Sequence, residues 1–218
     1  MSRQFLQNVF VLTALVSAGP QLTLAADSSG PEAWFLPAVL DDSNTEVTFE
    51  VDSTWHTIHG TTSGIKGKLW LEDPTRPDSI RGSVEIPVKT FDTDNSSRDG
   101  RLREVMNESA FNSIQFDLIS VDGLCAPVSD SMAAGCSAAA AGKLSIAGHE
   151  EAVNPSLSVR KGGNGYIVAG TATFSWKLFP IEDPSILVAR LDQNVSIKFT
   201  VKLGPPSGSP TAERNFSK

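Results

Sequence analysis

Apolar and polar residues alternate along most of the chain with a period of two. Alternation of this kind is typical of β-strands that have one apolar face and one wet face. Similar runs occur at residues 47–52, 80–89, 114–119, 144–146, 157–159 and 166–176. The clearest run closes the set, where Val195, Ile197, Phe199, Val201 and Leu203 alternate with Ser196, Lys198, Thr200 and Lys202.

Turn sequences rich in Gly, Pro, Asp and Asn separate these runs, at residues 72–74, 122–123, 161–165 and 182–184. Many strands without intervening helices indicate an all-β antiparallel barrel or sandwich. The long run at residues 165–176 favours a closed barrel of about eight strands, because tilted barrel strands are long.

Residues 95–111 break this pattern. The segment is polar and charged, and Leu102, Val105 and Met106 stand at helical spacing. Asn95 or Ser96 is suited to cap a helix start. We therefore expect one short helix between two strands.

The two ends of the chain differ from the middle. Residues 1–26 contain one charged residue, Arg3, followed by an apolar run and then by two small residues, Ala25 and Ala26, at a plausible cleavage site. This is the pattern of a cleaved secretory signal. The alternative, a membrane anchor, is disfavoured because the apolar run is short. Residues 27–39 are expected to be flexible and residues 205–218 disordered, which leaves a single domain at 40–204.

Charge narrows the range of partners. Apolar residues make up 40% of the 218 residues and charged residues 20%, an ordinary globular mixture. The net charge is −7, and it becomes −8 once Arg3 is removed with the signal. An acidic surface argues against nucleic acid as a partner and against capture at an anionic membrane by charge.

Two cysteines, Cys125 and Cys136, lie in a loop rich in Ala, Ser and Gly. In an exported protein such a pair is expected to form a disulfide. The alternative is a metal or haem site, but the chain has no CxxC sequence.

Several stretches, in order, resemble the YceI-like family of lipid- and polyisoprenoid-binding proteins. The resemblance covers roughly residues 40–203 and is strongest at 88–102. There, Val-Lys-Thr-Phe-Asp-Thr (88–93) is followed by Asn95, Arg98-Asp99 and Leu102. The opening strand (40–51), Gly67-Lys68-Leu69, residues 111–116, 144–153 and 194–199 also fit. Each stretch is short, and it is their order and spacing that carry the resemblance.

The resemblance implies a lipocalin-like antiparallel barrel with a helix packed beside it. It also implies an internal apolar channel that holds a long isoprenoid or other lipid, and export to the bacterial periplasm. Three features depart from the family pattern: Asn112-Ser113 replaces a usual proline, the cysteine-bearing loop looks like an insertion, and residues 175–183 differ.

Strand parity predicts which side chains point inward and could line such a channel. Equally, these residues could fill a dry core. The predicted lining is Phe49, Val51, Val84, Ile86, Phe116, Leu118, Leu144, Ile146, Val168, Phe174, Trp176, Ile197 and Phe199.

Polar candidates are few. Arg98 could contact a diphosphate or quinone oxygen at the head of a ligand, or it could anchor the helix start to a strand end through Asp99. Trp55, Trp70 and Trp176 could border a channel mouth, or merely pack, with Trp34 near the first strand.

Other chemistry has weaker support. His56 and His59, three apart on a strand, face opposite sides and are poorly placed to share a metal with each other or with His149. No GxSxG sequence suggests a hydrolase, and acidic pairs such as Asp41-Asp42 fall at turns, where they are expected to be solvated. We therefore expect no metal, no catalytic residues and no cofactor beyond a bound lipid.

The sequence thus predicts a non-catalytic periplasmic carrier of an isoprenoid-type lipid, either polyprenyl or quinone. The alternative is a structural or interaction module of the cell envelope with a filled barrel core. Whether the chain forms a homodimer is left open.

Overall fold

A computed structural model describes residues 35–76, 78–125, 135–183, 185 and 190–205. The predicted signal (1–26), most of the predicted flexible segment (27–34), Trp34 and nearly all of the predicted tail (206–218) lie outside the described residues.

The described residues form eleven strands, one α-helix and two short 3-10 helices. In chain order they are β1 (Ala38–Leu40), β2 (Thr45–Ser53), β3 (Thr57–Thr61), β4 (Lys66–Leu71), β5 (Ile80–Pro87), η2 (Val88–Thr90), α1 (Ser96–Val105), β6 (Ser113–Asp122), β7 (Cys136–Ile146), β8 (His149–Val153), β9 (Ser156–Gly162), β10 (Gly165–Ser175), η3 (Trp176–Leu178) and β11 (Leu191–Leu203).

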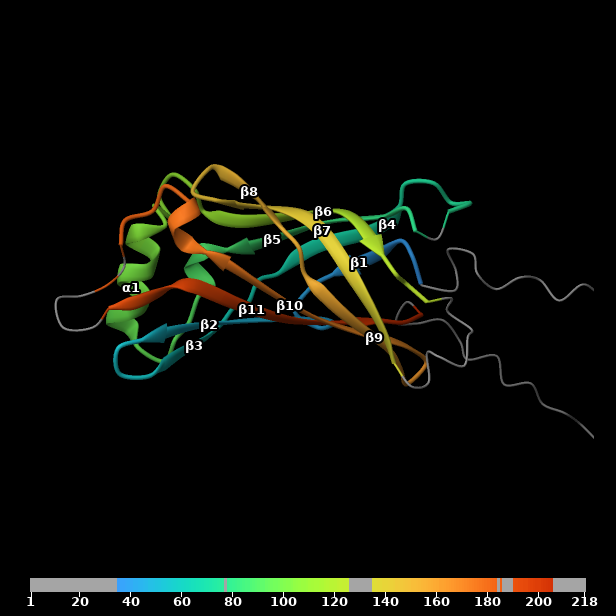
Figure 1. The fold of residues 1–218 in the computed structure, drawn as a ribbon, viewed down its shortest axis with the longest axis horizontal. Coiled ribbons are helices and arrows are strands. Elements are labelled where there is room, and N and C mark those ends of the chain that lie inside the picture. The colour runs from blue at the N-terminus through green and yellow to red at the C-terminus, as the bar shows by residue number, and fades with distance from the viewer. Residues whose placement is uncertain (1–34, 77, 126–134, 184, 186–189, 206–218) are drawn as a thin grey trace, which may run out of the picture.

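All strands belong to one antiparallel sheet that curls into a half-barrel (Figure 1). Its order is β1-β4-β5-β6-β7-β9-β10-β11-β2-β3, and β8 pairs with β7 beside this path. The all-β barrel class and the single helix are confirmed. The strand number exceeds the expected eight because β1, β3 and β8, of three to five residues, are too short for a clear alternation.

The edge strands β1 and β3 form no ladder with each other in the described residues. Thr61, at the end of β3, forms an isolated antiparallel bridge with Asp92 instead. The carboxylate of Asp42, in the β1–β2 turn, accepts hydrogen bonds of 2.8 and 2.9 Å from the backbone N–H groups of Gly64 and Ile65, in the β3–β4 connection. These bonds continue the contact between β1 and β4 past the last ladder pair, Leu40 and Gly67.

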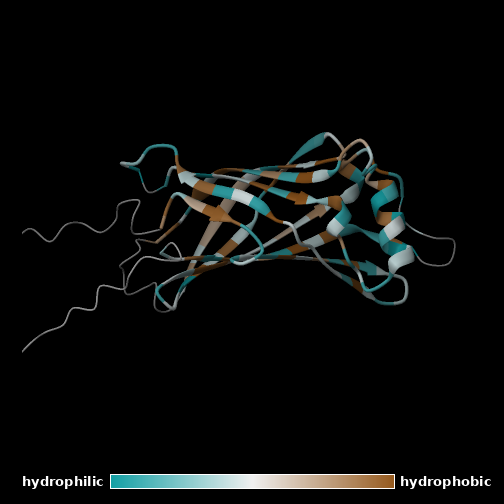
Figure 2. Ribbon diagram, turned by 180° about the vertical axis from the view of Figure 1, so that it is seen from behind, coloured by the Kyte–Doolittle hydropathy of each residue, from teal (hydrophilic) through white to brown (hydrophobic). Residues whose placement is uncertain are grey.

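Alternation decides which side chains face the inside. Hydrophobic and hydrophilic positions alternate along the strands (Figure 2). Buried inward residues form one cluster around Leu40, Val159 and Val201 and a second around Leu144 and Ile146. Helix α1 lies across one end of the curled sheet (Figure 1). A disulfide between Cys125 and Cys136 connects the residues after β6 to the start of β7.

The folded part begins earlier than the predicted boundary at residue 40. Ala38 and Val39 already belong to β1, and Leu36 is buried in the core. The expectation of flexibility up to residue 39 was therefore wrong for 35–39, because β1 gains a ladder with β4 that its three residues could not reveal alone. No helix among the described residues has the length and apolarity needed to cross a membrane.

Candidate functional site

Two adjoining cavities occupy the inside of the half-barrel. The cavity at the α1 end has a volume of about 460 Å³, and the deeper cavity about 200 Å³. We call them the helix-end cavity and the deep cavity. Val47, Ile86 and Ile197 line both. These three side chains form the waist at which the cavities meet.

The residues of β11 line the two cavities in sequence order. Leu191 and Val195 line the helix-end cavity, Ile197 lines both, and Phe199 and Val201 line the deep cavity. The neighbouring antiparallel strand, β2, shows the same progression in reverse: Ser53, Val51 and Phe49 line the helix-end cavity, Val47 lines both, and Thr45 lines the deep cavity. The two cavities are therefore successive parts of one path along the barrel interior.

The deep cavity has a hydrocarbon wall. Its one hydroxyl-bearing residue is Thr45, whose Oγ1 donates to Asn44 Oδ1 at 2.8 Å and so already has a partner. A wall without free polar groups holds apolar chains and disfavours water. The remaining lining is contributed mostly by aliphatic residues and by Phe116 and Phe199.

Helix α1 covers the helix-end cavity with Leu102, Val105 and Met106. The helix begins where it does because Asn95 caps it: its side chain accepts a hydrogen bond from the Arg98 N–H. Asp99 lies in the first turn, where a carboxylate is favoured by the helix dipole. The predicted helix is confirmed, and of the two expected cap residues it is Asn95 that caps it, while Ser96 is the first residue of the helix.

Polar groups of the channel gather at this helix end. Asn95, Ser97, Arg98 and Arg101 line the helix-end cavity together with His56. No carboxylate is among the described residues that line either cavity. The channel is therefore apolar at its deep end and rich in hydrogen-bond donors at the α1 end.

Arg98 is held in place by Thr93. Its Nε donates to Thr93 Oγ1 at 2.7 Å, and its Nη2 donates to the Thr93 carbonyl oxygen. Asp99 accepts from the N–H of the same threonine at 3.0 Å and from its hydroxyl. The predicted anchor thus exists, but Arg98 and Asp99 both act on Thr93 and not on each other.

Arg101 joins α1 to the segment after η3. Its guanidinium forms ion pairs with Glu104 at 2.9 Å and with Glu182 at 3.3 Å. The hydrogen bond to Glu104 is the largest cause of the raised pKa of Arg101, so the guanidinium stays charged. All three side chains are substantially exposed, so these pairs contribute little to stability.

Comparison with known proteins agrees with this architecture. The model of the YceI-like domain matches residues 39–203. The chain belongs to the YceI-like domain family. No functionally curated protein matches it.

Two solved structures share the fold of this YceI-like domain. BcnA of Burkholderia cenocepacia is 16% identical, with a TM-score of 0.58 over 72% of this chain and 95% of its own. A polyisoprenoid binding domain from Saccharophagus degradans, implicated in plant cell wall breakdown, is 10% identical, with a TM-score of 0.56 over 77% and 97%.

The YceI-like domain brings all the residues chosen by strand parity to the two cavities. Their contact with a ligand stays a prediction. Phe49, Val51, Leu144, Ile146, Phe174 and Trp176 line the helix-end cavity, Val84, Phe116, Leu118, Val168 and Phe199 line the deep cavity, and Ile86 and Ile197 line both.

The three tryptophans expected at a mouth have different surroundings. Trp176 lies in η3 and not in a strand, and its Nε1 donates to the Asp192 carbonyl oxygen at 2.9 Å. Trp70 is no part of the described lining and has Lys68 Nζ at 5.0 Å from its ring. Trp55 is 70% exposed in the β2–β3 turn.

The predicted lining left out some residues inside the strands, such as Val47, Val195 and Val201. It also missed lining residues outside the strands and the small residues behind the phenylalanines. Phe91 and Ile181 reach the helix-end cavity from connecting segments, where no periodic signal exists. Gly60 and Gly170 lie directly opposite Phe49 and Phe199 in the ladders. A glycine inside a strand marks a close approach, and this was the signal available in the sequence.

The histidines do not converge. His59 pairs with Glu50 at 3.1 Å, His149 with Glu151 at 2.9 Å, and His56 borders the helix-end cavity. Within the part of the chain that the structure describes, no three His, Cys, Asp or Glu side chains form a metal-binding group.

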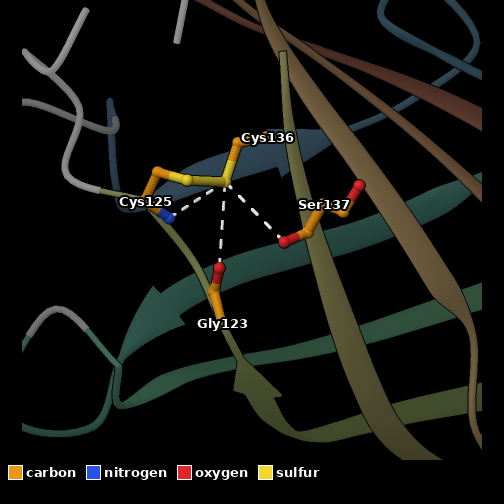
Figure 3. Close-up of a disulfide and its surroundings, with 4 residues drawn as sticks. All are labelled: Gly123, Cys125, Cys136 and Ser137. Atoms are coloured by element: carbon orange, nitrogen blue, oxygen red, sulfur yellow. Dashed lines mark hydrogen bonds between the residues drawn. A yellow bond between two sulfur atoms is a disulfide. The ribbon is translucent and has the colours of Figure 1, made fainter. Parts of the chain in front are cut away.

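The predicted disulfide between Cys125 and Cys136 is present and joins the end of β6 to the start of β7 (Figure 3). Cys136 Sγ accepts a hydrogen bond from the Cys125 N–H at 3.1 Å and lies 3.8 Å from the carbonyl oxygens of Gly123 and Ser137. Cys136 is buried next to the wall of the deep cavity.

Proposed function

We propose that this protein is a non-catalytic carrier that holds a long isoprenoid-type lipid, polyprenyl or quinone, inside its channel. The observation that carries the proposal is the pair of adjoining cavities with an apolar wall, joined at Val47, Ile86 and Ile197. The shared fold of the polyisoprenoid binding domain from Saccharophagus degradans supports the same ligand class.

The energetics favour a long chain. Each methylene group moved out of water contributes about 0.8 kcal/mol, while association costs roughly 4–15 kcal/mol. Between about 5 and 19 buried carbon groups are then needed before net affinity appears. A chain that fills both cavities meets this requirement better than a short one.

The distribution of polar groups gives the ligand a direction. The tail would lie in the deep cavity and the head beside α1. Arg98 is the candidate for the head-group contact, because it lines the helix-end cavity and Thr93 fixes its orientation. A guanidinium has five N–H donors, so the two bonds to Thr93 do not exhaust it.

The alternative, an interaction module with a filled core, has less support, because the described core encloses two cavities. We also propose export to the periplasm. Residues 1–26 have a basic start, an apolar run and the small residues Ala25 and Ala26 at their end, which is the pattern of a cleaved signal peptide. Cell fractionation and N-terminal sequencing of the mature protein test export.

The decisive experiment is mass spectrometry of organic extracts from protein purified without detergent. We expect a stoichiometric polyprenyl or quinone species. Ile197→Trp, which fills the waist, should lose it, whereas Lys198→Trp, the outward neighbour on β11, should keep it. Protein that carries no lipid and takes up no added isoprenoid would refute the proposal.

The head-group role of Arg98 is tested separately. Wild-type protein should bind a polyprenyl phosphate more tightly than the matching alcohol. In Arg98→Gln this preference should fall about tenfold or more, since a hydrogen bond to a charged group contributes about 1.5–3 kcal/mol. An unchanged preference would leave Arg98 with only its structural role at Thr93.

A further inference from the structure

Three phenylalanine rings of the channel lie against glycines of neighbouring strands. A Cβ added to Gly170 would come within 2.1 Å of Phe199 Cζ, and one added to Gly60 within 2.1 Å of Phe49 Cζ. At Gly142 the Cζ of Phe116 would be 2.4 Å away. Each ring therefore occupies space that any other residue would fill with its side chain.

This arrangement keeps the lumen open. Phe199 and Gly170 are direct partners in the β10–β11 ladder, and Phe49 and Gly60 are direct partners in the β2–β3 ladder. A ring that leans along the sheet over a glycine stays close to the wall. On the other side of Phe199 lies its β2 partner Val47, which also faces the channel, so the same ring displaced from the glycine turns toward the cavity.

Phe199 has a particular position on the path. Ile197 belongs to the waist, and Phe199 is the next inward residue of β11, at the entrance to the deep cavity. A chain that extends from the waist into this cavity of about 200 Å³ enters it beside the Phe199 ring.

We propose that the Phe199–Gly170 pair determines the length of the lipid chain that the channel accepts. Glycine at position 170 holds the ring on the wall, so a chain longer than the helix-end cavity can extend past the waist. This inference rests on the proposed lipid-binding function and assigns its selectivity to one residue pair. The ligand class is then an isoprenoid long enough to occupy both cavities.

Gly170 is the suitable position for the test. All three atoms closest to its added Cβ belong to the Phe199 ring, which can rotate. At Gly142, by contrast, the backbone oxygen of Asp117 would be 2.7 Å away, so a substitution there would move the strand. Gly170→Ala should therefore shift the ring and leave the sheet in place.

The experiment measures affinity for farnesol, with three isoprene units, and for solanesol, with nine, both delivered from cyclodextrin to the full mature chain. Gly170→Ala should bind solanesol about tenfold or more weakly, the loss expected from two buried methylene groups. Its affinity for farnesol should stay within about twofold. Gly170→Ala with Phe199→Leu should regain solanesol binding, because the smaller side chain clears the path.

Gly162→Ala is the matched control. It is the same substitution in the strand next to β10, and its added Cβ would meet a flexible side-chain end, Ile167 Cδ1, at 2.5 Å. Ile167 precedes the lining residue Val168, so it faces away from the channel. This variant should bind both alcohols as wild type does.

The outcomes separate the two proposals. If wild-type protein binds neither alcohol, the lipid-binding function fails and the length proposal fails with it. If wild type binds both and Gly170→Ala lowers both equally or neither, only the length proposal is overturned. Should Gly170→Ala not fold, Val201→Phe, which narrows the deep cavity one inward position further, must show the same selective loss of solanesol.

Discussion

Asp42 and Ile65 extend the contact between β1 and β4: the carboxylate Oδ1 of Asp42 accepts a 2.9 Å hydrogen bond from the Ile65 N–H. Ile65 is buried, whereas Asp42 is exposed. The acidic pair at residues 41–42 was expected to be merely solvated. The structure shows that its second member, Asp42, binds the backbone of the β3–β4 connection next to the β1–β4 ladder.

Loss of the Asp42 carboxylate should therefore loosen the contact between the β1–β2 turn and the residues before β4. Asp42→Ala is expected to lower the free energy of unfolding by about 1–2 kcal/mol, because two backbone donors lose their acceptor and one of them belongs to the buried residue Ile65. Asp42→Asn keeps one acceptor oxygen and should lose less. Urea denaturation measures both, and equal stability of wild type and Asp42→Ala would contradict the role of this residue.

The start of α1 depends on the buried pair of Asp99 and Thr93. Asp99→Ala should lower the free energy of unfolding by about 2 kcal/mol and increase hydrogen exchange in α1, because the N–H and hydroxyl of Thr93 would lack an acceptor in a buried site. Glu104→Ala, an exposed carboxylate on the same helix, is the control and should change stability by less than about 0.5 kcal/mol. Similar losses in the two variants would argue against a special role for Asp99.

The disulfide should stabilise the deep end of the barrel. Replacing Cys125 and Cys136 together by alanine is expected to lower the free energy of unfolding by about 3 kcal/mol, the chain-entropy value for a loop of this size. Wild-type protein should lose a similar amount in reductant, and the double variant should not respond to reductant. A reductant-insensitive wild type would show that the bridge contributes no stability.

Acid should destabilise the turns. The side-chain hydrogen bond from Ser43, and then that of its N–H, lowers the pKa of Asp41 below its ordinary value of 3.8; the bonds from Thr75 do the same for Asp73. Because these pKa values are lowered in the folded state, the stability that they contribute is complete above the ordinary value and is lost as pH falls through the lowered one.

The melting temperature should thus be nearly flat across neutral pH and fall in the acid range below the ordinary value of 3.8. A variant with Asp41→Asn and Asp73→Asn should show a shallower fall, measured by thermal scans from neutral to acid pH. If the melting temperatures of the variant and of wild type fall equally steeply with pH, other carboxyl groups cause the acid sensitivity.

Much of the fold follows from local sequence signals. The period of two in 195–203 places Val195, Ile197, Phe199, Val201 and Leu203 on one face, as β11 has them. Asn95 sets the start of α1 because a cap acts on the next three residues. Trp176 was placed in the cavity lining, but the assumption of a continuous strand was wrong at that position, since η3 begins there.

By itself, the sequence determined the long strands, the single helix, the cysteine pair and much of the inward set of side chains, because these depend on alternation and on neighbours within a few residues. Tertiary structure decided the rest. Asp42 meets Gly64 and Ile65 only because β1 pairs with β4, and the Phe199 ring lies against Gly170 only because the two residues are ladder partners. Whether inward side chains meet or leave a channel depends on the curvature of the sheet and on the directions of the rings, which no local pattern encodes.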